Sequence, residues 1–270
     1  MADYWYHNLL LFGASAVAGA VNAVAGGGTL LTFPSLMWAG QSARIANATS
    51  TVALWPGQVS SLWAYRSEMK SSCGELVLLA IPSFLGGLLG ALLLLKTSEQ
   101  SFALLVPYLV LLATLLFIVQ EPITRWQRRR QHATQTPGPA AAAVQLERSP
   151  GWRWAGVLVF QFLIGTYGGY FGAGIGILML AAYGFLGLTN IHHMNALKNL
   201  NNLTINGVAA ILFVLKGMVD WRLASLMAVG AILGGYAGAG TARRIGQKTV
   251  RRVIIAIGLG LTVWLLLKPM

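Results

Sequence analysis

The stretch VNAVAGGGTLLTFPSLMWAG, residues 21–40, decides how this chain folds. It is apolar along nearly its whole length, yet three consecutive glycines, Gly26, Gly27 and Gly28, interrupt it. Glycine permits positive φ and a close approach of the backbone to another group, so the run predicts a break between two helices. We expect a short helix to begin near Thr29, with unpaired first amides and a partly positive amino end.

A second stretch of the same kind follows in the other half of the chain. It reads GYFGAGIGILML at residues 169–180, and its glycines Gly172, Gly174 and Gly176 predict a helix start near Ile175. Two such helix starts that meet near the middle of a membrane would form an anion site built largely of backbone amides. The alternative is that these glycines only allow neighbouring helices to pack closely.

Composition predicts an all-α integral membrane protein. Of the 270 residues, 56% are hydrophobic and 10% are charged, whereas soluble domains carry about 25% charged residues. With their uncharged flanks, several apolar blocks approach the roughly 20 residues that a helix needs to cross a bilayer. We therefore expect a multi-pass protein of a bacterial-type inner membrane, with its first apolar segment retained. The blocks without a charged residue are 81–95, 101–119, 156–171, 206–215, 223–240 and 253–267.

The charge pattern divides the chain into three parts. The net charge is +12, but the basic residues lie between apolar blocks, where they set membrane orientation and do not indicate a nucleic-acid partner. Residues 121–153 contain seven basic residues, counting His132, and four prolines. We interpret them as a flexible cytoplasmic linker between an N-terminal membrane repeat, residues 1–120, and a C-terminal membrane repeat, residues 154–270.

The two halves resemble each other beyond their glycine breaks. Each continues with a helix that opens on Asn-Ala, at Asn47 and Asn195, and carries an amide eleven residues later, at Gln58 and Asn206. If each broken segment re-enters and returns to the same side, each half has three crossing helices, the basic clusters lie inside, and the repeats are inverted. If each broken segment crosses fully, there are eight spans and the basic cluster 243–252 lies outside. Charge favours the re-entrant arrangement.

Polar residues share one face of the helix after each break. Such residues usually face a bundle interior or a cavity, although some asparagines could simply join helices. Lys198 can donate three hydrogen bonds to an anion, or it could extend to the membrane surface. With Thr29 and the glycines of both breaks, the predicted substrate site contains Asn47, Ser50, Thr51 and Gln58 from the first half and Asn195, Lys198, Asn199, Asn202 and Asn206 from the second.

Charged groups near the membrane ends give weaker indications. His192 and His193 could titrate during transport or be inert, and Arg44 could attract anions at the comparable entry of the first half. All seven carboxylates lie at segment ends or in connections, which disfavours a cation as substrate. A small anion is therefore the expected substrate, and we expect no cofactor and no metal.

At these residues the chain resembles the sulfite exporter TauE/SafE family of membrane permeases. The resemblance rests on GGGTLLTFPSLMWAG (26–40) and ANATSTVAL (46–54) in the first half, and on GYFGAGIGILML and MNALKNLNN (194–202) in the second. The second break differs from the first in lacking three consecutive glycines. The resemblance implies export of sulfite or a small organosulfonate, driven by an ion or substrate gradient.

Two other functions and one assembly stay open. A passive anion channel would share the membrane fold. A membrane enzyme is not expected, because the four histidines stand in no HExxH motif and no GxSxG motif is present. Small-residue faces could support a homodimer, although close packing within one chain is the expected use. These faces are formed by Gly86, Gly87 and Gly90, and by Gly234, Gly235 and Gly238.

Overall fold

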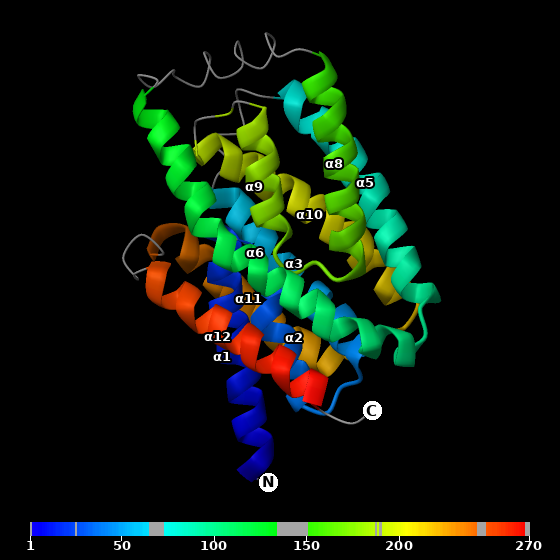
Figure 1. Cartoon of the computed structure of the whole chain (residues 1–270). Coiled ribbons are helices and arrows are strands. Elements are labelled where there is room, and N and C mark those ends of the chain that lie inside the picture. Colours follow the sequence, from blue (N-terminus) through cyan, green and yellow to red (C-terminus); the bar gives the residue numbers. More distant parts are fainter. Residues whose placement is uncertain are drawn as a thin grey trace.

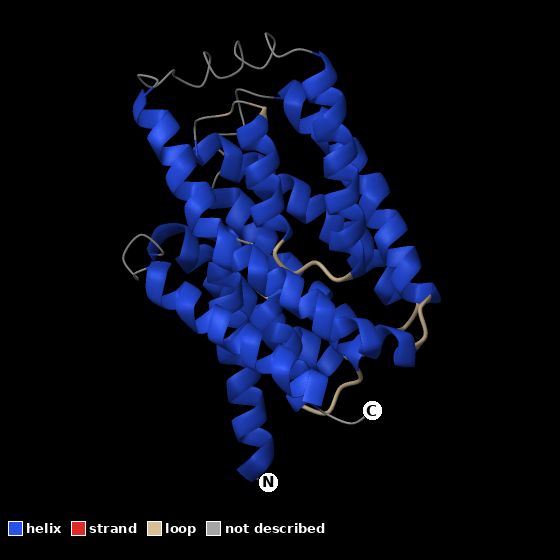
Figure 2. Cartoon of the chain, in the orientation of Figure 1, coloured by secondary structure: helices blue, strands red, loops and turns tan. Residues whose placement is uncertain are grey.

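The computed structural model describes residues 2–24, 26–64, 73–133, 151–186, 188, 191–241 and 247–267. Within these ranges every regular element is a helix, and loops connect the helices (Figure 2). The expectation of an all-helical chain is confirmed for this part of the protein. The helices carry the labels of Figure 1.

The first half contains a broken segment followed by three longer helices. Helix α1 (Ala2–Val24) is followed after a short break by α2 (Thr29–Trp38), which begins at the predicted residue. The longer helices α3 (Ala43–Ala64), α5 (Cys73–Lys96) and α6 (Glu99–Ala133) come next. Helix α2 packs back against α1 and against α3, so the chain reverses at the break.

The second half repeats this order of elements. Helix α8 (Gly151–Tyr170) is followed by α9 (Ile175–Phe185), which also begins at the predicted residue and packs back against α8. Helices α10 (Ile191–Leu215), α11 (Trp221–Thr241) and α12 (Gln247–Leu267) complete the chain. Helices α2 and α9 contain 10 and 11 residues. At about 1.5 Å per residue they are too short to cross roughly 30 Å of hydrocarbon.

Helices of one half pack mainly against helices of the other. Helix α1 lies along α11, and α8 lies along α5 in the corresponding way (Figure 1). Helix α3 contacts α11 as α10 contacts α5, while α3 and α10 contact each other and α6 contacts α12. Exchanging the two halves therefore leaves this list of pairs unchanged.

The small-residue faces are used inside this bundle. A Cβ atom on Gly87 would stand 3.1 Å from the Cα of Ile205, and one on Gly165 would stand 3.1 Å from the Cα of Gly86. Gly234 and Gly235 likewise face the backbones of α1 and α3. Close packing within the chain is thus confirmed for these glycines, while the contacts of Gly238 lie outside the described residues. The homodimer stays a prediction, and these faces are not available for it.

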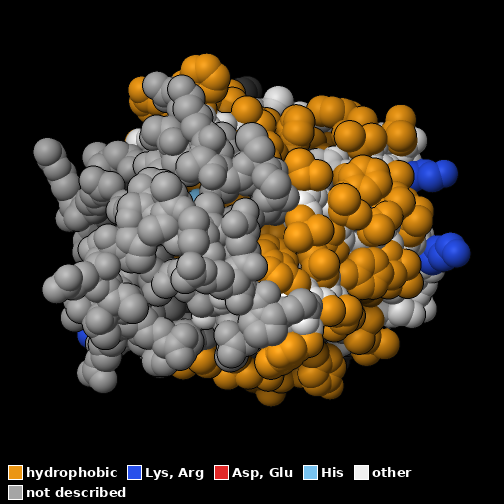
Figure 3. All heavy atoms as spheres, turned by 90° about the horizontal axis from the view of Figure 1, so that it is seen from above, with side chains coloured by type: hydrophobic (Ala, Val, Ile, Leu, Met, Phe, Trp, Pro, Cys, Tyr) orange, Lys and Arg blue, Asp and Glu red, His pale blue; other side chains and the backbone are white. Residues whose placement is uncertain are grey.

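Large apolar side chains cover the outside of the bundle. Leu104, Leu105 and Tyr108 on α6 and Val77 and Ile81 on α5 are all exposed. Figure 3 shows hydrophobic side chains over most of the described surface on one side of that view. Residues 77–96 and 99–119 are each long and apolar enough to cross a membrane. An apolar surface of this extent is expected where lipid replaces water.

The helical boundaries differ from the prediction at the linker. Helix α6 continues past residue 120 to Ala133, and α8 already begins at Gly151. Parts of the predicted linker are therefore helical, while residues 134–150 lie outside the described residues. The apolar run that ends near residue 119 did not indicate this extension, because a helix can continue beyond its apolar part.

Candidate functional site

The two glycine breaks meet inside the bundle. A Cβ atom on Gly26 would lie 3.0 Å from the Cα of Gly176, and one on Gly27 would lie 3.4 Å from the amide nitrogen of Gly174. Only glycine allows this approach, because Gly26 and Gly27 have φ of +75° and +105°. The expectation that the two breaks lie together is therefore confirmed.

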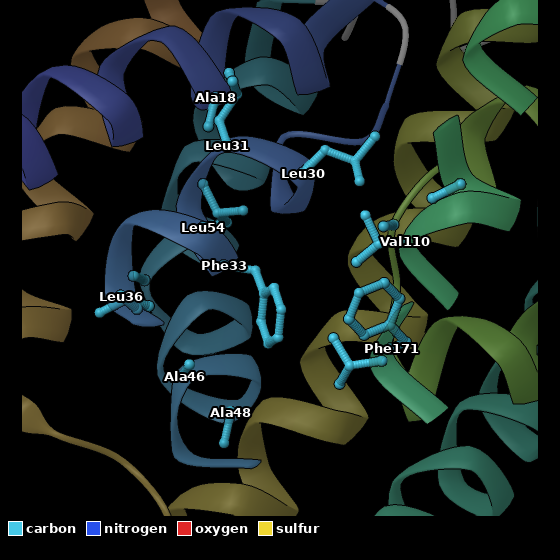
Figure 4. Packing of buried hydrophobic residues seen from close by; sticks show 14 of the residues in the cluster. Ala18, Leu30, Leu31, Phe33, Leu36, Ala46, Ala48, Leu54, Val110 and Phe171 are labelled. Atoms are coloured by element: carbon cyan, nitrogen blue, oxygen red, sulfur yellow. The ribbon is translucent and has the colours of Figure 1, made fainter. Parts of the chain in front are cut away.

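An aromatic contact supports the same junction. Phe33 on α2 packs edge-on against Phe171 in the second break, with ring centroids 5.4 Å apart (Figure 4). Both rings are buried in the main hydrophobic cluster, together with Val110 of α6. The break regions thus lie within packed protein, where non-helical backbone is tolerated at membrane depth.

Both first helices end in the same backbone turn. The amide of Gly26 donates to the carbonyl of Val21 at 3.2 Å, and the amide of Gly172 donates to the carbonyl of Tyr167 at 3.3 Å. Each bond spans five residues, one more than an α-helical bond. Gly172 has φ of +81°, close to that of Gly26.

The second helices begin differently. The amide of Gly28, just before α2, donates to Asn22 Oδ1 at 2.7 Å. The residue at the same distance before Gly174 is Gly168, which has no side chain. Among the described residues no hydrogen-bond acceptor is found for the amides of Gly174, Ile175 and Gly176. The amino end of α9 therefore offers more unpaired N–H groups than the amino end of α2.

Asn47 joins α3 to the end of α8. Its Nδ2 donates to the carbonyl of Tyr170 at 3.0 Å, while its Oδ1 is buried and has no partner among the described residues. The hydroxyl of Thr51 donates to the carbonyl of Asn47 at 2.9 Å. Ser50 shares a 2.6 Å hydrogen bond with Thr32 of α2. Ser50 and Thr51 are thus held within their own half.

The amides at the ends of the two polar stripes also meet. Asn206 Nδ2 donates to Gln58 Oε1 at 3.3 Å and to Asn202 Oδ1 at 3.0 Å. Asn206 Oδ1 would lie 3.6 Å from a Cβ atom on Gly172. These contacts connect α3, α10 and the second break, so three of the predicted polar residues are brought together.

The remaining stripe residues lie nearer the amino end of α10. Lys198 is fully buried, and Asn199 is 4% exposed. Asn199 Nδ2 and Asn195 Oδ1 are buried without a partner among the described residues. No contact given for the described residues places these two asparagines at the breaks, so their role in the site stays a prediction.

The residues predicted at the membrane entries, Arg44, His192 and His193, do not share one kind of environment. The guanidinium of Arg44 donates to the carbonyl of Leu95 at 3.1 Å, and the Arg44 amide donates to Glu99 at 3.2 Å. Arg44 therefore links the start of α3 by hydrogen bonds to the end of α5 and the start of α6. His193 is buried, and the side chain of His192 lies outside the described residues.

Comparison with known proteins shows the family to which the chain belongs. The family model described as "Sulfite exporter TauE/SafE" matches residues 11–265, which include both breaks and both polar stripes. The chain belongs to the TauE/SafE family. By this match the protein is a member of a family of membrane transporters. No solved structure matches the chain.

Curated relatives of the TauE/SafE chain cover nearly its whole length. It is 28% identical over 94% of its length to a "Probable membrane transporter protein" of Haemophilus influenzae, covering 92% of that protein. It is 29% identical over 92% of its length to "Probable membrane transporter protein YfcA" of Escherichia coli K12, covering 85% of it. A Sinorhizobium protein, "Probable membrane transporter protein ORF9", is 27% identical over the full chain and is covered over 96% of its length.

The TauE/SafE chain also contains a buried polar cluster that the sequence did not indicate. Ser83 of α5 lies 2.9 Å from Asn201 Oδ1 and accepts from Gln161 Nε2 at 2.8 Å. Asn201 Nδ2 donates to the hydroxyl of Tyr183 at 3.0 Å and to the carbonyl of Leu197 at 2.9 Å. Helices α5, α8, α9 and α10 are thereby joined at one point.

Two members of this polar cluster, Ser83 and Asn201, correspond to alanines when the two halves are exchanged. Ser83 stands three residues before Gly86, and Ala231 stands three residues before Gly234. Asn201 stands six residues after Asn195, where the first half has Ala53 after Asn47. The high asparagine content near residue 200 was a usable signal, but the stripe spacing selected Asn202 and not Asn201.

Proposed function

We propose that this protein exports a small sulfur-containing anion, sulfite or an organosulfonate, which binds where the two helix breaks meet. The observation that carries the proposal is the contact of Gly26 with Gly176, which brings the amino ends of α2 and α9 into one buried region. The family match supports the class of cargo. No covalent chemistry is needed, since the anion only exchanges water for protein donors.

The charge of the site favours an anion. The first amides of a helix carry roughly half a positive charge, and three amides of α9 have no acceptor among the described residues. The buried side chains of the described part include Lys198 but no carboxylate. Lys198 lies on the same face of α10 as Asn202 and Asn206, so its charge adds to that of the helix ends. In this proposal these donors replace the water shell of the cargo.

Alternating access would follow from an inverted arrangement of the two halves. In this proposal each half has a re-entrant segment, formed by α1–α2 or by α8–α9, followed by three crossing helices. The main contacts between the halves are unchanged when the halves are exchanged, as expected for repeats related by a twofold axis in the membrane plane, although α6 also contacts α2 and α3 without a matching contact of α12. An odd number of crossings gives the halves opposite orientations. Rocking of one half against the other would expose the junction to each side of the inner membrane in turn.

A counterflow experiment tests the proposal. Liposomes that contain the purified protein and unlabelled sulfite are diluted into radiolabelled sulfite, and the label inside is followed with time. A carrier produces a transient accumulation of label, because exchange is faster than net loss. Label that only equilibrates would indicate a channel, and absence of any protein-dependent uptake would refute sulfite transport.

Lys198→Met tests the site within the same assay. It keeps the length of the side chain and removes its charge, so exchange should fall by about tenfold or more, the usual effect of losing a hydrogen bond to a charged group. Thr204→Ala is the control and should leave exchange unchanged, because Thr204 also lies on α10 but outside the predicted site, and its hydroxyl donates to the carbonyl of Leu200 in its own helix. Equal exchange by Lys198→Met and the unchanged protein would remove Lys198 from the site.

A further inference from the structure

The packing of the helices divides most of them into two groups that do not coincide with the two halves of the sequence (Figure 1). Helices α1, α2 and α3 contact one another, and α1 and α3 also contact α11 of the second half. We call these four helices bundle A. Helices α8, α9 and α10 contact one another, and α8 and α10 also contact α5 of the first half. These four helices form bundle B, so each bundle contains one helix from the other half of the chain.

Within each bundle, this exchanged helix makes backbone contacts with its neighbours. A Cβ atom on Gly19 of α1 would stand 2.9 Å from the amide nitrogen of Gly235 on α11. In bundle B, a Cβ atom on Gly86 of α5 would stand 2.9 Å from the amide nitrogen of Thr166 on α8. Backbones this close leave no side chains between the helices that could change rotamer. We therefore expect each exchanged helix to move together with its bundle.

Hydrogen bonds follow the same division. The buried polar cluster around Asn201 joins α5, α8, α9 and α10, which are the four helices of bundle B. In bundle A, the hydroxyl of Ser60 on α3 lies 3.3 Å from the carbonyl of Ile232 on α11. The side chain of Gln41, before α3, donates at 2.9 Å to the carboxylate of Asp220, before α11. These contacts cross between the halves of the sequence but stay within one bundle.

The boundary between the two bundles is built differently and passes through the candidate site. Helices α3 and α10 meet there through side chains, since Trp55 Nε1 donates to a backbone carbonyl of α10 at 3.2 Å and Asn206 Nδ2 donates to Gln58 Oε1 at 3.3 Å. The two helix breaks, which belong to different bundles, also meet at this boundary. Contacts made by side chains can be exchanged through changes of rotamer, so one bundle can shift against the other while each keeps its own backbone contacts.

We propose that the two bundles, and not the two halves of the sequence, are the bodies that move against each other when the cargo site changes the side to which it opens. Helix α5 then moves with the second half and α11 moves with the first. The need for such a motion rests on the proposed function, whereas the composition of the moving bodies rests on the packing alone. The proposal replaces the rocking of whole halves by the rocking of bundles that have exchanged one helix.

Cross-links where α3 begins distinguish the two kinds of motion. Cys73, the only cysteine, is replaced by serine, and pairs of introduced cysteines are joined by a reducible bis-methanethiosulfonate reagent in the counterflow assay. Arg44→Cys with Leu95→Cys joins one half to itself but bundle A to bundle B, at a place where the Arg44 guanidinium lies 3.1 Å from the Leu95 carbonyl. Sulfite exchange should be lost when this pair is joined and should return after reduction.

The matched control joins the two halves within one bundle. Gln41→Cys with Asp220→Cys lies at the same end of α3, and both residues belong to bundle A. Its cross-link, with complete joining verified by mass spectrometry for both pairs, should leave exchange unchanged. Loss of exchange in this control, or normal exchange after Arg44→Cys and Leu95→Cys are joined, would overturn the inference.

A measurement without cargo decides the matter if the protein does not exchange sulfite at all. In liposomes, nitroxide labels are attached to Val77→Cys at the start of α5 together with either Leu215→Cys at the end of α10 or Trp38→Cys at the end of α2, all at exposed positions. Double electron–electron resonance should give one distance for the first pair, within bundle B, and two distances for the second, which joins the bundles within one half. Any other pattern would overturn the inference, whereas absence of sulfite exchange alone would refute only the proposed function.

Discussion

The two helix breaks are alike on one side and different on the other. Helices α1 and α8 end in the same backbone turn, whereas α2 and α9 begin with differently paired amides. In both, a glycine amide donates to a carbonyl five residues earlier, at 3.2 Å and 3.3 Å. At the start of α2 the protein supplies its own acceptor, Asn22, whereas at the start of α9 the corresponding residue is Gly168. The same backbone turn is therefore followed by a paired amide in the first half and by unpaired amides, among the described residues, in the second.

The same difference extends to the helices after the breaks. Ser50 on α3 bonds to Thr32 of α2, while the corresponding residue of α10 is the buried Lys198. Asn201 and Ser83 of the polar cluster correspond to Ala53 and Ala231 when the two halves are exchanged. Among the described residues the one fully buried lysine belongs to the second half, whereas buried side-chain atoms without a partner occur in both halves, at Arg44 and Asn47 and at Gln161, Asn195 and Asn199. Variants in the two breaks and in the helices after them test this difference between the halves.

The largest effect is expected from filling the junction. Gly26→Ala would put a Cβ atom 3.0 Å from the Cα of Gly176 and would also strain a residue with φ of +75°. Gly40→Ala strains the backbone without creating a close contact, because Gly40 has φ of +88° and nothing lies within 4 Å of its Cβ position. Sulfite exchange in liposomes should fall more than about tenfold in Gly26→Ala and less than about twofold in Gly40→Ala.

This pair of variants separates contact from backbone strain. Similar losses in both would mean that positive φ alone matters and that the two breaks need not touch. Normal exchange by a folded Gly26→Ala protein would contradict a cargo site at the junction.

A smaller effect is expected from making the polar cluster around Asn201 as apolar as the corresponding place in the bundle. Ser83→Ala gives α5 the residue that α11 has at Ala231, and it removes the partner of Gln161 Nε2 and of Asn201 Oδ1. Two buried polar groups are then left unpaired, so unfolding should require about 2–3 kcal/mol less free energy. The measurement is chemical unfolding in detergent, followed by tryptophan fluorescence.

Ser15→Ala is the control for this change. Ser15 is equally buried, but its hydroxyl donates only to the carbonyl of Phe12 in its own helix. Its removal should cost less than about 1 kcal/mol. Equal effects of the two variants would show that the cluster does not hold the four helices together.

The smallest effect on cargo binding is expected at the closed break. Asn22→Ala leaves the Gly28 amide without its acceptor and should lower stability by about 1–2 kcal/mol. Sulfite affinity, measured by calorimetry, should change less than about threefold, because the open amides belong to α9. A loss of affinity as large as that of Lys198→Met would place the cargo at α2 instead.

The sequence predicted the helix starts, but it could not predict how they differ. Thr29 and Ile175 follow directly from where the glycines end the apolar runs. A meeting of the two helix starts was expected, and the contact of Gly26 with Gly176 shows that the two breaks lie together. The bond from Gly28 to Asn22 could not be predicted, because it depends on how the turn folds back onto α1. The cluster at Asn201 was missed because its partners come from four helices whose neighbours a single sequence does not reveal.

The most direct test of the account is an experimental structure of the protein soaked with selenite, which resembles sulfite and scatters X-rays anomalously. We expect an anomalous peak within hydrogen-bonding distance of the amides of Ile175 and Gly176, beside the contact with Gly26. A peak at the amino end of α2, or at a place remote from both breaks, would contradict it.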